Sequence, residues 1–165
     1  MSRARRRGRR WAQDVATTVE PGTYYRWVRR LKLLEAKLKR TVVLYLATVI
    51  VLVPIDFLFL GLVAKGFFAS QVGDMLGEIR LAPAILFYLL YVAGILVFVS
   101  GSATATWPST LRYGALFGLF CYATFELTSL SLLKYWTWAV VLVDVSWGTF
   151  VTAAASTLVG LLVAD

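Results

Sequence analysis

The sequence predicts an all-α, polytopic membrane protein: a four-helix transmembrane bundle with an N-terminal amphipathic interfacial helix. Three observations predict this fold class. Of the 165 residues, 59% are hydrophobic and only 16% are charged, whereas soluble domains carry about 25% charged residues. Four long apolar stretches follow residue 40. Residues 1–40 hold 13 of the 17 Lys and Arg residues but 3 of the 9 Asp and Glu residues, so the net positive charge resides in this basic extension.

The four apolar stretches are each close to the length of about 20 residues that crosses a bilayer as a helix. Lipid cannot hydrogen-bond to free backbone groups, so each stretch is predicted to be helical. Residues 102–110 between the second and third stretches are predicted to form a polar turn, in which Pro108 stops the helix. The transmembrane domain is expected over residues 41–165, with spans at about 41–64, 82–101, 111–133 and 139–163.

The basic extension divides into two parts. Residues 1–10 form a polycation without an apolar face, and after Pro21 and Gly22 a helix is predicted at about 23–40 with Thr23 as its N-cap. One arc of this helix is apolar, which is typical of a helix lying on an anionic membrane surface. A helix packed on a partner subunit would show the same pattern, so both interpretations stay open. The apolar arc comprises Tyr24, Trp27, Val28, Leu31, Leu34 and Leu38.

Arginine side chains of the extension are the expected contacts to anionic lipid or to other subunits of a membrane complex. Binding of nucleic acid is disfavoured, because no folded readout module accompanies the basic run. These candidate contact residues are Arg3, Arg5, Arg6, Arg7, Arg9, Arg10, Arg26, Arg29 and Arg30.

The same charge asymmetry predicts the orientation in the membrane. Basic segments stay on the cytoplasmic side, and four spans return the C-terminus to that side. The expected location is the bacterial cytoplasmic (inner) membrane with both termini cytoplasmic, and an organelle inner or photosynthetic membrane is the alternative.

Three carboxylates lie inside the predicted spans, namely Asp56, Glu126 and Asp144. A charged group at membrane depth costs at least about 2.5–3.5 kcal/mol, so each one calls for a reason. With a rise of about 1.5 Å per residue, all three fall about 21–22 Å from the inner boundary. Tyr88 and Tyr91 of the second span lie near the same level. The sequence therefore predicts an intramembrane polar cluster of these five residues in the outer half of the bundle.

Small residues recur every four positions on the third and fourth spans, and such stripes let helices approach closely. Asp144 and Glu126 lie on these stripes, so both acids are predicted to face protein and not lipid. The predicted packing residues are Gly114 and Gly118 on the third span and Gly148, Thr152, Ser156 and Gly160 on the fourth.

Two interpretations of the polar cluster stay open. Carboxyls hydrogen-bonded to Tyr, Thr and Trp groups would fix the register of the bundle. Alternatively, the acids would form a proton- or cation-coupled site or a pocket for a small or lipidic substrate. Lys65 and Lys134, near the outer boundary, could snorkel or reach toward the acids. Trp136, Trp138 and Trp147 are interpreted as packing residues and interfacial anchors.

The composition disfavours an enzyme. The chain has no histidine, which removes the usual imidazole ligand and the usual base of a catalytic triad. Cys121 is the single cysteine, so no internal disulfide forms. No metal and no cofactor are predicted; bound lipids are expected, and contact with a pigment that needs no histidine ligand is compatible with the composition.

Four motifs carry a resemblance to a known family. They are IDFLFLGLVAKGFF (55–68), FYLLYVAGILVF (87–98), GALFGLFCYATFELTSL (114–130) and LVDVSWGT (142–149). Residues 41–163 with these motifs resemble an uncharacterised bacterial family of four-span membrane proteins, a domain of unknown function with the number twenty-one seventy-seven. The family typically has Trp within the stretch Phe57 to Phe59, and Asp and Asn where this chain has Glu126 and Ser129. The resemblance implies the four-span fold and the importance of the polar cluster, and residues 1–40 are an added extension.

Two functions from different classes follow as expectations. The first is a non-catalytic accessory or structural subunit of a larger membrane complex, respiratory or photosynthetic in kind, docked through its basic N-terminus and helix faces. The alternative is a small proton- or cation-coupled transporter, or a lipid-handling membrane protein, that uses the carboxylates Asp56, Glu126 and Asp144.

Overall fold

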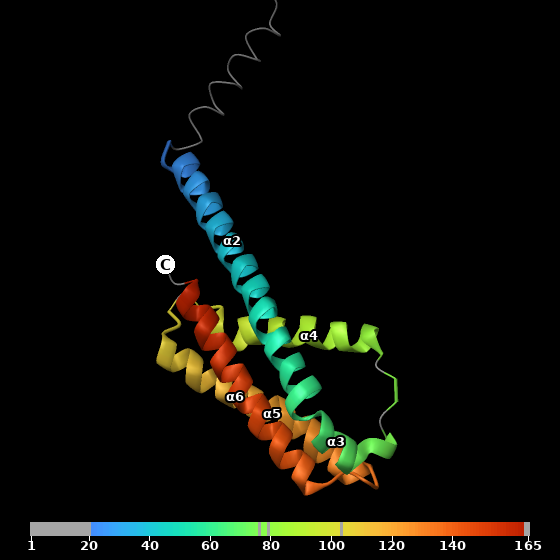
Figure 1. Cartoon of the computed structure of the whole chain (residues 1–165). Coiled ribbons are helices and arrows are strands. Elements are labelled where there is room, and N and C mark those ends of the chain that lie inside the picture. Colours follow the sequence, from blue (N-terminus) through green and yellow to red (C-terminus); the bar gives the residue numbers. More distant parts are fainter. Residues whose placement is uncertain (1–20, 76, 79, 103, 164–165) are drawn as a thin grey trace, which may run out of the picture. The chain divides into compact units, whose positions relative to one another are not determined.

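The computed structural model describes residues 21–163 except residues 76, 79 and 103 (Figure 1). The predictions made for residues 1–10 and for the side chain of Tyr24 lie outside the part that it describes. Residues 1–39 and residues 40–165 form two units, which are described separately. The described residues are helical without strands, and four helices are long and apolar enough to cross a membrane. The predicted all-α membrane fold is thus confirmed.

The described part of the chain begins with a long helix, α2 (Pro21–Leu58), which passes into a π-helical turn, η1 (Phe59–Val63). A short helix, α3 (Lys65–Val72), and a 3₁₀ turn, η2 (Gly73–Met75), follow. The remaining spans are α4 (Leu81–Ile95) with the π-helical turn η3 (Leu96–Ser100), α5 (Trp107–Leu132) and α6 (Trp138–Leu162).

Three details of the secondary structure differ from the predictions. Helix α2 begins at Pro21 and not after a Thr23 cap, because proline suits the first helical turn, where its missing N–H is not needed. For the same reason Pro108 starts α5 and does not end a turn, and the Thr106 N–H donates to Ser109 Oγ at 2.9 Å to cap this helix. Helix α3 lies in a segment that had been expected to be a loop.

In the first unit, the apolar arc of α2 is exposed along its described length. The exposed side chains include Trp27, Leu31, Leu34 and Leu38. The Arg30 guanidinium lies 6.0 Å from the Trp27 ring centroid, and Lys39 pairs with Glu35 at 2.8 Å. Contact of this face with lipid or with a partner subunit stays a prediction.

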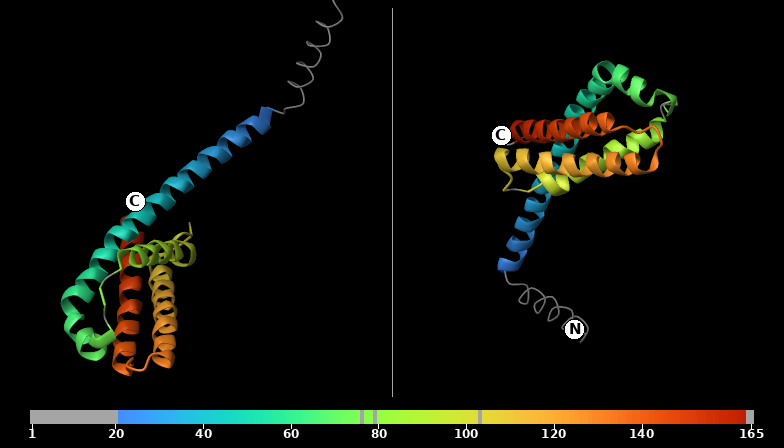
Figure 2. Two further views of the ribbon diagram at one scale, coloured as in Figure 1. Left: turned by 90° about the vertical axis from the view of Figure 1, so that its right-hand side faces the viewer. Right: turned by 90° about the horizontal axis from the view of Figure 1, so that it is seen from below.

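Helices α5 and α6 lie side by side and antiparallel in both figures (Figures 1 and 2). Glycines allow their close approach. A Cβ atom on Gly114 would lie 2.5 Å from Ser156 Oγ and 3.0 Å from Ala153 Cα, and one on Gly118 would collide with the Gly148 carbonyl oxygen. Thr152 and Ser156 are buried, and their hydroxyls donate hydrogen bonds of 2.6 Å to the carbonyl oxygens of Gly148 and Thr152 on the same helix.

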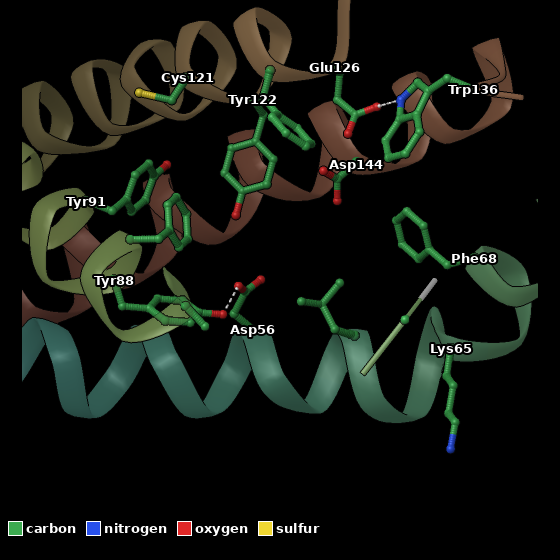
Figure 3. Close-up of a pocket in the computed structure, with 15 residues that line it drawn as sticks. Asp56, Lys65, Phe68, Tyr88, Tyr91, Cys121, Tyr122, Glu126, Trp136 and Asp144 are labelled. Atoms are coloured by element: carbon green, nitrogen blue, oxygen red, sulfur yellow. Dashed lines mark hydrogen bonds between the residues drawn. The ribbon is translucent and has the colours of Figure 1, made fainter. Parts of the chain in front are cut away.

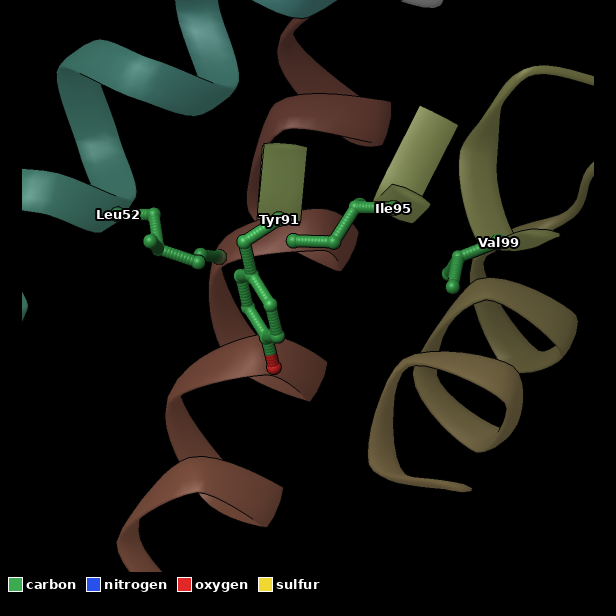
Figure 4. Packing of buried hydrophobic residues seen from close by; sticks show 5 residues of the cluster. Leu52, Tyr91, Ile95 and Val99 are labelled. Carbon is green, nitrogen blue, oxygen red and sulfur yellow. The ribbon is translucent and has the colours of Figure 1, made fainter. Parts of the chain in front are cut away.

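Helix α4 packs on the bundle through its C-terminal half only. A cluster of buried residues from α2, α4, η3 and α6 holds it there, comprising Leu52, Tyr91, Ile95, Val99 and Ala155 (Figure 4). The N-terminal half is different, since Leu81, Ile85 and Leu86 are all more than half exposed. Helix α4 crosses α5 and α6 obliquely (Figures 1 and 2).

We expect the substitution Gly118→Ala to destabilise the fold by about 1–3 kcal/mol, the usual cost of overpacking a close contact. The added methyl would meet the backbone of α6, which can yield only if the two helices separate. Gly160→Ala on α6 is the matched control, because the nearest atom to its new Cβ would be 4.0 Å away. Thermal unfolding in detergent, followed by circular dichroism, measures both. Equal stability of the two variants would contradict this account of the α5–α6 contact.

Candidate functional site: an intramembrane carboxylate cavity

The three intramembrane acids line one cavity of about 640 Å³, here called the carboxylate cavity (Figure 3). Its volume lies within the range of about 300–1,000 Å³ that is usual for small-molecule sites. Helices α2, α3, α4, α5 and α6 and the π-helical turn η1 all contribute residues to its walls. The lining residues are Asp56, Leu60, Lys65, Phe68, Gly77, Ala84, Phe87, Tyr88, Tyr91, Cys121, Tyr122, Phe125, Glu126, Trp136 and Asp144.

Asp56 on α2 is buried, and both of its oxygens accept hydrogen bonds. The Tyr88 hydroxyl of α4 donates to Oδ2 at 2.7 Å, and the Trp147 indole N–H of α6 donates to Oδ1 at 2.6 Å. Trp147 also stacks on Phe59, with ring centroids 3.8 Å apart. One carboxyl group thereby connects three helices, and its two polar atoms are satisfied without a cation.

Glu126 on α5 has 0% exposure and is only half satisfied. Its Oε2 accepts from the Trp136 indole N–H at 2.7 Å, and Trp136 lies in the loop between α5 and α6. Its Oε1 is buried and finds no hydrogen-bond donor among the described residues. Buried polar atoms are nearly always hydrogen-bonded, so an unpartnered carboxylate oxygen indicates a missing proton or ligand.

Asp144 on α6 lies next to Glu126, and the two carboxyls are within hydrogen-bonding reach of each other (Figure 3). An ionised carboxylate can only accept, so this contact is a hydrogen bond only when one of the two acids carries a proton. Two carboxylates that share one space repel each other, and a proton or a cation between them removes this repulsion. The pair therefore offers one site that a proton or a cation can occupy.

Two tyrosines complete the wall between Asp56 and the acid pair. Tyr91 is buried and shares a 2.7 Å hydrogen bond with Thr152 of α6, so its hydroxyl joins the packing stripe and not an acid. Tyr122 of α5 extends across the cavity toward the side of Asp56 (Figure 3). Its ring also fills the space over Gly148, where a Cβ atom would collide with it.

Helix α3 covers one end of the cavity. Phe68 points into the space from this helix (Figure 3), and Gln71 Oε1 accepts a 3.0 Å hydrogen bond from the hydroxyl of Thr137, the N-cap of α6. Lys65 at the start of α3 is exposed and its amine points away from the acids, so it does not reach down to them as had been considered (Figure 3).

An open apolar groove of about 630 Å³ runs between α4 and α5 beside the cavity. Leu90, Phe98 and Phe120 on its walls are each more than 60% exposed, so in a bilayer this groove faces acyl chains. The groove and the carboxylate cavity adjoin, because Phe87, Tyr91 and Cys121 line both. The groove residues are Phe87, Leu90, Tyr91, Phe98, Phe117, Phe120, Cys121 and Thr124.

The structure brings together all five residues of the predicted polar cluster, and it places the predicted packing residues Gly114, Gly118 and Gly148 at the close α5–α6 contact. Gly160 does not take part in this close approach, because the nearest atom to a Cβ there would be 4.0 Å away. Trp147 packs on Phe59 as expected, but a polar role for the indoles of Trp136 and Trp147 was not predicted. Both indoles donate to buried carboxylates. The overlooked signal is chemical, since a buried carboxylate needs donors and the indole N–H only donates.

Among the described residues, no group of three or more His, Cys, Asp and Glu side chains is arranged to hold a metal ion. Comparison with curated proteins and with solved structures found no match. The family model described as "Predicted membrane protein (DUF2177)" does match, over residues 41–162, and these residues contain the four spans and the carboxylate cavity. The chain therefore belongs to this family of predicted membrane proteins, whose function is unknown, and carries a basic N-terminal extension ahead of the family region.

Proposed function

We propose that this protein is a small proton-coupled transporter or lipid-handling membrane protein, and that the Glu126–Asp144 carboxyl pair exchanges a proton when a ligand enters or leaves the carboxylate cavity. The observation that carries the proposal is the fully buried Glu126, whose Oε1 faces Asp144 without another donor. A shared proton satisfies that oxygen in the empty cavity. A ligand that donates to the same oxygen makes the proton dispensable, which couples the two events.

Asp56 has a different part in this proposal. Its two oxygens already accept from Tyr88 and Trp147, so it needs neither a proton nor a ligand to be satisfied. It holds α2, α4 and α6 together beside the cavity and adds negative potential to it. The proposal involves no catalytic step.

The proposed location is the bacterial inner membrane, with both termini cytoplasmic and the cavity in the outer half of the bilayer. The charge asymmetry of the chain supports this orientation. Arg40 supports it as well, because its guanidinium lies 3.5 Å from the Gly101 and Ser102 carbonyl oxygens, at the end of the spans opposite to α3.

The accessory-subunit function stays a prediction, and the exposed apolar arc of Trp27, Leu31, Leu34 and Leu38 favours it. If the extension docks the chain into a complex, deletion of residues 2–23 will detach it from its co-purifying partners and leave the four-span fold intact. Co-purification followed by size-exclusion chromatography measures this. Retained association, together with loss of activity in Asp56→Asn or Asp144→Asn, would contradict the subunit function.

For the acid pair, we expect dicyclohexylcarbodiimide, an apolar reagent for protonated carboxyls, to add once per chain at Glu126 or Asp144. Labelling should fall as pH rises, because the shared proton leaves and the carboxylate form does not react. Intact-mass and peptide mass spectrometry in lipid nanodiscs measure the extent and place of the label.

The variants Glu126→Gln and Asp144→Asn separate a titrating pair from a structural one. Either variant removes the pair and should shift the pH dependence of labelling, because the remaining acid no longer shares a proton, whereas Asp56→Asn should leave the pH dependence unchanged. Labelling that stays constant with pH in the unaltered protein would show that the proton never leaves, and this outcome contradicts a coupled function.

Asp56→Asn is expected to destabilise the fold by about 1–3 kcal/mol, because the hydrogen bonds from Tyr88 and Trp147 to a carboxylate become weaker bonds of a neutral amide. Tyr88→Phe removes one of the same two hydrogen bonds, so in the double variant the two effects will not add. Asp74→Asn, at an exposed position, is the control and should stay within about 0.5 kcal/mol of the unaltered protein. Unfolding in detergent measures all four proteins. Additive losses would contradict the assigned contact.

A further inference from the structure

The groove between α4 and α5 and the carboxylate cavity lie next to each other. Phe87, Tyr91 and Cys121 line both spaces. The groove residues of α4 and η3 extend from Phe87 to Phe98, a distance of about 16 Å along a helix. Its wall is aromatic and aliphatic apart from the Tyr91 and Thr124 hydroxyls and the Cys121 thiol. Such a surface fits an extended hydrocarbon chain, and its exposed flank opens to the bilayer and not to water.

The cavity beside this groove has the opposite character. Asp56, Glu126 and Asp144 face one space, and Lys65, the only basic residue among its described lining residues, is directed away from them (Figure 3). A negatively charged headgroup would be repelled there. A neutral alcohol could donate one hydrogen bond but would leave the charge of the acid pair uncompensated. A cationic donor would compensate the negative charge and would also donate a hydrogen bond to Glu126 Oε1.

Aromatic side chains surround the acids and further favour an organic cation over a metal ion. Tyr88, Tyr122, Phe125 and Trp136 lie on the cavity wall, and the faces of such rings attract ammonium groups. Among the described residues, the carboxylates of the cavity do not form a group that is arranged to hold a metal ion.

On these observations, and resting on the proposed function, we propose that the substrate is a single-chain amphiphile with a primary ammonium head. The head occupies the carboxylate cavity between Glu126 and Asp144, and the tail lies in the α4–α5 groove. The ammonium group enters as the shared proton leaves, so one positive charge replaces another and the net charge of the cavity is unchanged.

The test uses the full chain in phosphatidylcholine nanodiscs, with stearylamine as the probe. Stearic acid and stearyl alcohol have the same hydrocarbon chain and differ only in the head, and propylamine has the head without the long tail. Native mass spectrometry measures the amphiphile retained by the protein, and empty nanodiscs correct for partition into lipid. We expect stearylamine to bind at least about tenfold more tightly than each of the other three probes.

Variants test separately whether the cavity binds the ammonium head and whether the groove binds the hydrocarbon tail. Glu126→Gln or Asp144→Asn should weaken stearylamine binding by about tenfold to a hundredfold, since a hydrogen bond to a charged group is lost. Phe120→Ala, at an exposed groove position, should weaken stearylamine by about threefold to tenfold and leave propylamine unchanged. Asp74→Asn removes an exposed acid outside the cavity and should change nothing. If Glu126→Gln does not fold, the half-buried Asp144 supplies the same measurement.

Each contrary outcome has one meaning. Equal binding of stearylamine and stearyl alcohol would overturn the ammonium head, and equal binding of propylamine and stearylamine would overturn the tail groove. Either result can occur while carbodiimide labelling of the acid pair still depends on pH, in which case the proton-coupled function stands and only the substrate class fails. Release of one proton per bound stearylamine, measured with a pH indicator in weakly buffered solution, would support both.

Discussion

The close approach of α5 and α6 is the constraint on which the site depends. Gly118 leaves no room for a side chain against the Gly148 backbone, and this contact fixes the distance between the two helices. Toward the same end of the pair, Glu126 follows Gly118 on α5, and Asp144 precedes Gly148 on α6. The helices are held together at Gly118 and Gly148, about two turns from Glu126 and one turn from Asp144. This contact keeps the two acidic side chains beside each other.

The acids in the cavity are not equivalent, and their hydrogen bonds explain the difference. Asp56 accepts from a phenol and an indole, so its negative charge or its dipole is met by donors from two other helices. Glu126 has one indole donor, and its second oxygen meets another acid. In low-dielectric surroundings an unsatisfied polar atom is costly. Glu126 therefore brings an unsatisfied acceptor into the carboxylate cavity, whereas Asp56 does not.

Helical periodicity was sufficient to predict that the three acids face one another inside the bundle. Asp56, Glu126 and Asp144 line one cavity because residues on apolar spans can turn polar groups only toward one another, and Gly114, Gly118 and Gly148 lie in the close α5–α6 contact that their spacing predicted. Trp136 could not be assigned in this way. It lies in a loop, where no helical repeat relates its side chain to Glu126, and its position depends on how the chain reverses after α5. Pro108 was misread because proline has the same appearance in sequence at the start of a helix as at its end.

The π-helical turn η3 has a mechanical consequence for α4. The Gly101 N–H bonds to the Leu96 carbonyl at 2.7 Å, so this turn contains one more residue than a regular one. An extra residue of this kind can migrate along a helix while the backbone bonds reform behind it. Each residue that it passes rotates by about 100° around the axis. Migration of this extra residue from η3 into α4 would therefore rotate the helix beside the groove. The side chains that face α5 would be exchanged for others while the span stays helical.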